Sequence, residues 1–184
     1  VKGPTENRII EAIKQTPKSK KIIITGCLPK ISYERLTNET RFDAVTGPST
    51  GQDIIKIVER VTAGEKILDQ QALEEKPKTK LTLTRINTNT VISILPINYC
   101  CLGSCSYCCV VFARGNLQSY SIQEIIERVK TDLTVGTKEF WITSQDTACY
   151  GRDIGTNLAK LLHALSDMEG DFKIRVGMMT PNMI

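Results

Sequence analysis

The sequence predicts an α/β protein in which helices cover parallel β-sheets. Short apolar, β-branched runs such as Lys21–Thr25 and Val91–Ile97 are typical of buried strands. Segments with apolar residues at helical spacing alternate with these runs, as they do when helices pack on a parallel sheet. With 184 residues, of which 41% are hydrophobic and 24% charged, the chain has ordinary globular composition. It has room for one domain or for parts of two.

The first 64 residues contain two expected helices and two expected strands. One helix should run from Glu6 to about Gln15, with isoleucines on one face. Strands are expected at Lys21–Thr25 and Asp43–Gly47, and a second helix should open at Thr50 with Asp53 in a capping-box-like position.

The second half repeats the order strand, helix, strand, helix, strand. The expected elements are Val91–Ile97, a helix from a Ser121–Glu124 capping box to Gly136, Glu139–Thr143, a helix over Asn157–Asp167, and Lys173–Gly177. This order is the repeating unit of a βα barrel or of an open parallel sheet. Three strands are too few to close a barrel, and the chain begins without methionine, so we expect a fragment.

The helical and strand patterns weaken between residues 65 and 90, and we place the domain boundary there. Lys76, Lys78, Lys80 and Arg85 occur in this segment without an acidic residue between Lys76 and Thr90. The segment is either a solvated linker with an edge strand near Lys80 or a surface that contacts a nucleic-acid backbone.

The loop from Pro96 to Tyr120 shows no helical or strand period, and it carries Cys101, Cys105 and Cys108. An odd total of seven cysteines, without a signal sequence or an apolar span, favours metal binding in a reducing compartment, the cytoplasm. Structural zinc needs four ligands, whereas three thiolates on a [4Fe–4S] cluster leave one iron open to a small molecule. The adjacent Cys100 and Cys109 are poor fourth ligands, because neighbouring side chains diverge.

The cysteine triplet, with Tyr107 before its last member, resembles the signature of the radical S-adenosylmethionine (SAM) superfamily. That resemblance implies that the open iron binds the amino and carboxylate groups of SAM and that reduction generates a deoxyadenosyl radical. The flanking sequences resemble the methylthiotransferases of this superfamily. The segments that carry this resemblance are Cys101–Cys108, Ala113–Leu117, Ser119–Tyr120, Thr143–Thr147, Tyr150–Asn157 and Gly177–Met179 with Pro181.

These segments are most similar to the archaeal and eukaryotic branch, which modifies N6-threonylcarbamoyladenosine beside the anticodon of transfer RNA. The implied function is addition of a methylthio group to carbon 2 of that nucleoside, with the anticodon loop of tRNA as partner. The resemblance makes residues 1–64 the C-terminal part of an α/β methylthiotransferase domain and residues 65–90 a basic linker. Residues 91–184 become the first β/α units of a radical-SAM, TIM-like partial barrel.

The resemblance also implies the site residues. Cys101, Cys105 and Cys108 would hold the SAM-binding [4Fe–4S] cluster. Cys27 would be one of three ligands of a second [4Fe–4S] cluster, which supplies or carries the sulfur and which this chain cannot complete alone. The family usually has glycine in place of Cys100, so this cysteine is expected to affect the turn.

Further site residues follow from the position of active sites at the carboxyl ends of barrel strands. Gln145 and Asp146 can hydrogen-bond the amino group or ribose of SAM, and Tyr107 can contact its adenine. Helix capping and loop closure are the alternative roles of Gln145 and Asp146. Arg114 would touch the cluster, an RNA phosphate or a structural acidic partner.

Two alternatives to this function remain open at this point. One is a methylthiotransferase that acts on isopentenyladenosine in tRNA or on an aspartate of a ribosomal protein. The other is an inactive truncated product that binds a cluster, zinc or nothing, and we expect the isolated fragment to be inactive. The sequence does not identify the electron donor or the sulfur source.

Overall fold

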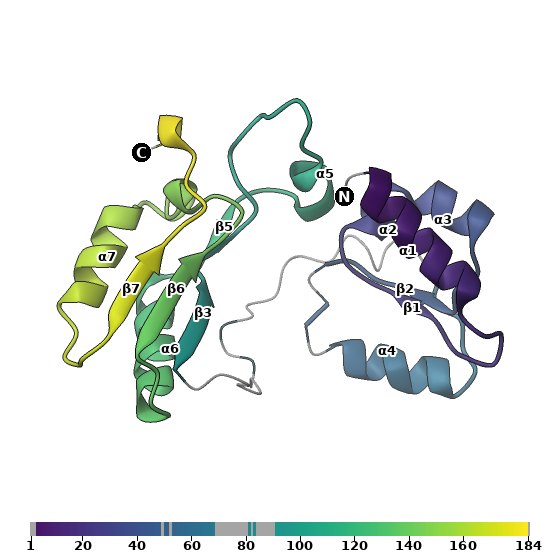
Figure 1. The fold of residues 1–184 in the computed structure, drawn as a ribbon, viewed down its shortest axis with the longest axis horizontal. Coiled ribbons are helices and arrows are strands. Elements are labelled where there is room, and N and C mark those ends of the chain that lie inside the picture. Colours follow the sequence, from purple (N-terminus) through teal and green to yellow (C-terminus); the bar gives the residue numbers. More distant parts are fainter. Residues whose placement is uncertain are drawn as a thin grey trace. The chain divides into compact units, whose positions relative to one another are not determined.

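The structure is a computed structural model that describes residues 3–48, 50–51, 53–68, 81, 83 and 91–183. The chain divides into two compact units (Figure 1). The first unit consists of Val1–Lys78 and Ser106–Gly115, and the second of Thr79–Cys105 and Asn116–Ile184. No described helix is long and apolar enough to cross a membrane.

The first unit is built on two short parallel strands, β1 (Ile23–Ile24) and β2 (Ala44–Val45). Ile67 adds a parallel bridge to Ala44, and its backbone N–H donates to the Asp43 carbonyl at 2.9 Å. Ile67, which belongs to the predicted linker at residues 65–90, is therefore part of this sheet.

Among the residues that the structure describes, five helices complete the first unit. They are α1 (Gly3–Gln15), α2 (Leu28–Ile31), α3 (Tyr33–Glu39), α4 (Asp53–Thr62) and α5 (Val110–Arg114). Figure 1 shows α1, α2 and α3 on one side of β1 and β2, with α4 on the other side. Buried side chains from α1, β1, α2 and α3 form the core, namely Ile10, Ile13, Ile24, Leu28 and Leu36.

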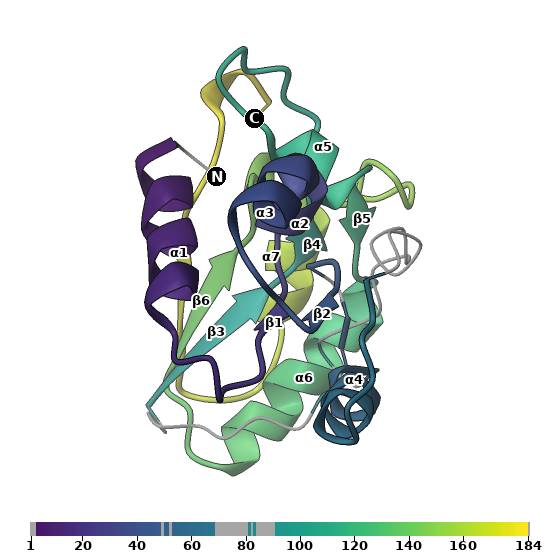
Figure 2. The same cartoon turned by 90° about the vertical axis from the view of Figure 1, so that its right-hand side faces the viewer.

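The second unit contains a parallel sheet in the order β3 (Ile92–Pro96), β6 (Glu139–Thr143) and β7 (Lys173–Val176). Figure 2 shows β3 and β6 running in the same direction. Helices α6 (Ile122–Thr134) and α7 (Leu158–Ser166) supply core side chains together with the strands, among them Leu95, Ile125, Val129, Phe140, Ile142, Leu161 and Leu165. The predicted strands, helices and Ser121–Glu124 capping box of this half are confirmed.

The run Val91–Ile97 predicts a buried strand, and the structure shows that β3 is fully buried on one face only. Ser93 and Leu95 are buried, whereas Ile94 between them is 56% exposed. On β6 and β7, the Arg175 guanidinium lies 4.6 Å from the centre of the Trp141 ring. The apolar run alone does not show that Ile94 is exposed.

The cysteine loop contains short regular elements, although its sequence shows no helical or strand period before Ser121. β4 (Asn98–Tyr99) pairs antiparallel with β5 (Gln118–Ser119), and α5 lies between them in the chain. Elements this short carry no complete hydrophobic period. Two 3₁₀ turns, η2 (Thr147–Cys149) and η3 (Pro181–Met183), also belong to the second unit.

The basic segment lies mostly outside the described residues. Lys76, Lys78, Lys80 and Arg85 are not among them, nor is most of the expected edge strand around Lys80–Thr84. The interpretation of this segment as a linker or a nucleic-acid surface therefore stays a prediction.

Glycine is required at position 151, where the loop after η2 folds back on itself. Gly151 has a φ of +80°, and a Cβ there would lie 2.7 Å from the Thr156 carbonyl carbon and 2.8 Å from the Asn157 nitrogen. We expect Gly151→Ala to lower the free energy of unfolding by about 3 kcal/mol, because backbone strain adds to overpacking. Urea denaturation measures the change.

Gly155 in the same loop provides the matched control. Its φ is +71°, but a Cβ there would meet nothing within 4 Å. Gly155→Ala should therefore cost about 1 kcal/mol, the backbone contribution alone. Equal losses for the two variants would contradict the close approach at Gly151.

Candidate functional site

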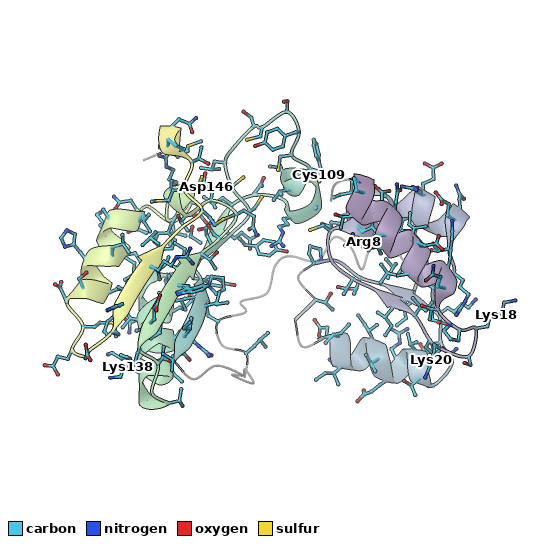
Figure 3. The ribbon with its side chains drawn as sticks, viewed as in Figure 1. Arg8, Lys18, Lys20, Cys109, Lys138 and Asp146 are labelled. Atoms are coloured by element: carbon cyan, nitrogen blue, oxygen red, sulfur yellow. The ribbon has the colours of Figure 1, made fainter. Side chains whose placement is uncertain are left out.

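The cysteine loop and the segment after β6 leave the sheet at the same edge. Pro96 and Thr143, the last residues of the adjacent strands β3 and β6, are paired. The Asn98 Nδ2 donates to the Asp146 carbonyl at 3.4 Å, which joins the two loops. Figure 3 shows Asp146 and Lys138 at opposite ends of β6. The prediction that both loops lie at the carboxyl ends of the strands is confirmed.

The structure brings Cys101 and Cys105 together around Gly103. A Cβ on Gly103 would lie 3.8 Å from the Cys101 sulfur and 3.9 Å from the Cys105 sulfur. Both sulfurs therefore border the space that a side chain at position 103 would occupy. Cys101 is half-buried and Cys105 is exposed, so the pair is accessible from solvent. These two thiols fit the demand of a cluster for adjacent thiolates on one accessible loop.

Cys108 and Cys27 belong to the first unit. The Val110 backbone N–H donates to the Cys108 sulfur at 3.4 Å. Cys27 is half-buried and stands at the N-cap of α2. Among the described residues, no three or more His, Cys, Asp or Glu side chains converge on one ion position.

Cys100 adopts a left-handed backbone conformation, at the position where the family that the sequence resembles usually has glycine. Its φ is +67°, and the residue is fully buried. The Gln145 Oε1 accepts a hydrogen bond from the Cys100 backbone N–H at 2.9 Å. The side-chain oxygen of Gln145 is therefore engaged with the cysteine loop.

Asp146 is 97% buried and is hydrogen-bonded by its own surroundings. Its Oδ1 accepts from the backbone N–H groups of Ala148 and Thr180, each at 3.1 Å, and its Oδ2 accepts from the Cys149 thiol at 3.3 Å. Burial alone would raise the pKa of Asp146, but the hydrogen bonds from Thr180, Cys149 and Ala148 outweigh it and lower that pKa. The carboxylate therefore stays ionised while it caps η2 and holds the segment after β7.

The sequence patterns do not identify Asn98 and Cys149 as parts of this site. Burial raises the pKa of the Cys149 thiol, and the nearby Asp146 carboxylate adds to the rise, whereas a backbone hydrogen bond with Leu102 opposes it. Cys149 is therefore a protonated thiol under the cysteine loop. The position of Asn98, two residues after the end of β3, is the sequence signal that could have identified it. Active-site residues of parallel folds gather at strand ends.

Two buried polar atoms at this edge lack a hydrogen-bond partner among the described residues. They are the Asn98 Oδ1 and the Ser144 Oγ. A buried polar atom without a partner is costly in free energy, so both atoms suit a polar ligand.

Tyr107 and Arg114, the remaining predicted site residues, differ in exposure. The Tyr107 side chain is 83% exposed, and Arg114 is half-buried.

Comparison with known proteins finds relatives along the whole chain. A Pyrococcus abyssi protein, described as a probable threonylcarbamoyladenosine tRNA methylthiotransferase, is 43% identical over 185 residues and aligns with 100% of this chain. The mouse and human threonylcarbamoyladenosine tRNA methylthiotransferases are 36% and 35% identical, each also over 100% of the chain. No protein-family model matches the chain.

The chain spans less than half the length of these relatives. It corresponds to 43% of the Pyrococcus protein and to 32% of the mouse and human proteins. The homology therefore covers this chain fully and those proteins in part.

Proposed function

We propose that this protein is a radical-SAM tRNA methylthiotransferase, on the premise that the whole chain is homologous to threonylcarbamoyladenosine tRNA methylthiotransferases. The proposed reaction adds a methylthio group to carbon 2 of N6-threonylcarbamoyladenosine beside the anticodon. The observation that carries the proposal is this homology, together with a cysteine loop at the carboxyl edge of a parallel sheet.

Cys101, Cys105 and Cys108 would hold the SAM-binding [4Fe–4S] cluster, and Cys27 would contribute to a second cluster in the full-length protein. When bound, these clusters and SAM supply the radical chemistry, the sulfur and the methyl group. The accessible pair of sulfurs around Gly103 supports an assignment in which Cys101 and Cys105 bind neighbouring irons.

The role of the neighbouring side chains is to bind and orient SAM. The exposed Tyr107 ring suits stacking on adenine. The Gln145 amide nitrogen suits the polar groups of SAM, and the buried Asn98 Oδ1 and Ser144 Oγ leave acceptors for a ligand donor. The ionised Asp146 would support this site by capping η2 and holding the loop after β6 in place. The proposed partner is the anticodon loop of tRNA.

A cytoplasmic location is part of the proposal. None of the seven cysteines, all of which are described, forms a disulfide. Persistent thiols and oxygen-sensitive clusters both suit a reducing compartment.

Anaerobic reconstitution with iron and sulfide tests the cofactor. We expect about four irons per SAM-binding cluster, as its [4Fe–4S] composition requires, and a change in its electron paramagnetic resonance (EPR) spectrum when SAM is added. Stoichiometric zinc without iron would overturn the assignment.

The substrate needs a separate experiment with the full-length gene. Cells that lack their own enzyme of this kind are complemented, and the nucleosides of their tRNA are analysed by mass spectrometry. The expected result is methylthiolated threonylcarbamoyladenosine, and an unchanged nucleoside alongside a modified isopentenyladenosine would overturn the proposed substrate.

A further inference from the structure

We propose that Asn98 and Gln145 are positioning residues that hold the turn at Cys100 and thereby orient Cys101 toward the cluster. The inference rests on the proposed function insofar as it takes Cys101 to be an iron ligand. The arrangement itself lies within the second unit.

The turn needs support because of its backbone conformation. Cys100 has a φ of +67° and is fully buried. A side chain with a Cβ is strained in this left-handed region, where glycine is favoured. Without external contacts, the peptide groups on either side of Cys100 would therefore relax toward another conformation.

Two side-chain amides supply these contacts. Gln145 Oε1 accepts from the Cys100 N–H at 2.9 Å, and Asn98 Nδ2 donates to the Cys100 carbonyl at 3.1 Å. The Asn98 amide is 97% buried, and its nitrogen faces the carbonyls of both Cys100 and Asp146. Rotating this amide would place its oxygen against two acceptors, so the orientation of the nitrogen is determined by its surroundings.

The consequence for Cys101 follows from the covalent geometry. The Cys100 carbonyl and the Cys101 nitrogen belong to one planar peptide group. The hydrogen bond from Asn98 therefore sets the plane from which the Cys101 side chain departs toward Gly103 and the Cys105 sulfur. Groups that orient a metal ligand without touching the metal typically change metal affinity by about 10-fold to 100-fold.

This role for Gln145 differs measurably from direct contact with SAM. A residue that only binds SAM should change SAM affinity and leave iron loading unchanged. A residue that positions Cys101 should change iron retention before SAM is added.

The first experiment measures the iron that survives chelator challenge after anaerobic reconstitution of this chain. Asn98→Ala and Gln145→Ala should each reduce retained iron about 10-fold or more. Gln145→Glu keeps an acceptor for the Cys100 N–H and should stay within about 3-fold of the parent protein, a margin below that range. Gln123→Ala, on the exposed face of α6, is the matched control and should change nothing.

Combining these variants with Cys100→Gly tests the mechanism. Glycine adopts the left-handed turn without strain, so Gln145→Ala should lose less than about 3-fold of its iron in the glycine background. Equal losses in the two backgrounds would overturn the inference, because the contact would then act independently of the turn. Urea denaturation of each variant verifies that the protein is folded.

Hydrogen exchange of the Cys100 amide in the metal-free protein separates this inference from the proposed function. Gln145→Ala should accelerate that exchange about 10-fold or more, as expected when a buried hydrogen bond of about 1.4 kcal/mol is removed. Unchanged exchange in this variant would overturn the inference even if the parent protein binds iron. Accelerated exchange in a protein that binds zinc and no iron would support the positioning role and overturn the proposed function.

Discussion

Alanine at Cys101, Cys105 or Cys108 is expected to lower the iron retained after anaerobic reconstitution by more than about 100-fold, above the range typical of groups that orient a ligand. Removing a ligand should exceed the effect of removing a group that merely orients one. Cys101 and Cys105 should show the same loss, because their sulfurs border one space around Gly103. Iron analysis, the visible absorption of the cluster and its EPR signal measure the loss.

Cys100→Ala and Cys149→Ala are the matched controls for the cysteine series. Both positions are buried beside the proposed ligands, and the Cys149 thiol donates to Asp146. Alanine at Cys100 retains the backbone groups that Asn98 and Gln145 contact, so its iron content should equal that of the parent protein. Loss of iron in the Cys100 variant would show that the ligand assignment is wrong.

Asp132→Ala is expected to cause the largest loss of folding stability, about 3–5 kcal/mol in the free energy of unfolding. Asp132 lies on α6, where its carboxylate pairs with Arg128 at 2.7 Å and accepts from the Ser93 hydroxyl of β3 at 2.6 Å. The side chains of Asp132 and Arg128 are 2% and 11% exposed. Removing the carboxylate would leave the buried Arg128 guanidinium without its counter-charge, with only the Leu81 and Leu83 carbonyls as acceptors among the described residues. Urea denaturation at constant pH measures the loss.

A double replacement distinguishes this explanation from simple loss of packing. Asp132→Leu combined with Arg128→Met removes both charges and should recover most of the stability, because apolar pairs often replace buried ion pairs at little cost. Asp171→Ala is the surface control, since its fully exposed carboxylate lies 3.9 Å from Lys138. That change should stay within about 0.5 kcal/mol, and a larger effect would mean that exposed charges govern stability here.

The sequence predicts the second unit well because its elements are long enough to show a period. The isoleucines after Ser121 repeat at helical spacing, and Glu124 completes a capping box that the structure contains. The alternating burial of Phe140 and Ile142 on β6 follows from the same kind of pattern. Local sequence and packing agree in these segments, so each element can be identified from its own residues.

The short helices and the support of the cysteine loop could not be predicted in this way. The helix α2 has four residues with Pro29 in its first turn, a position where the lack of an N–H is tolerated although proline suggests a break. The contact from Gln145 to Cys100 joins residues 45 positions apart. The sequence around either residue carries no pattern for such a contact, because its geometry depends on the pairing of β3 with β6.

The strands β3, β6 and β7 follow one another along the chain as well as in the sheet, so they are synthesised in that order. Asp146, whose carbonyl receives a hydrogen bond from Asn98, is itself held by the backbone N–H of Thr180, which follows β7. At a translation rate of about 5–20 residues per second, Thr180 emerges roughly 3–12 seconds after Tyr120, the last residue of the cysteine loop. During that interval the cysteine loop is complete in sequence but lacks its final support, so insertion of the proposed cluster into a nascent chain should await the residues that follow β7.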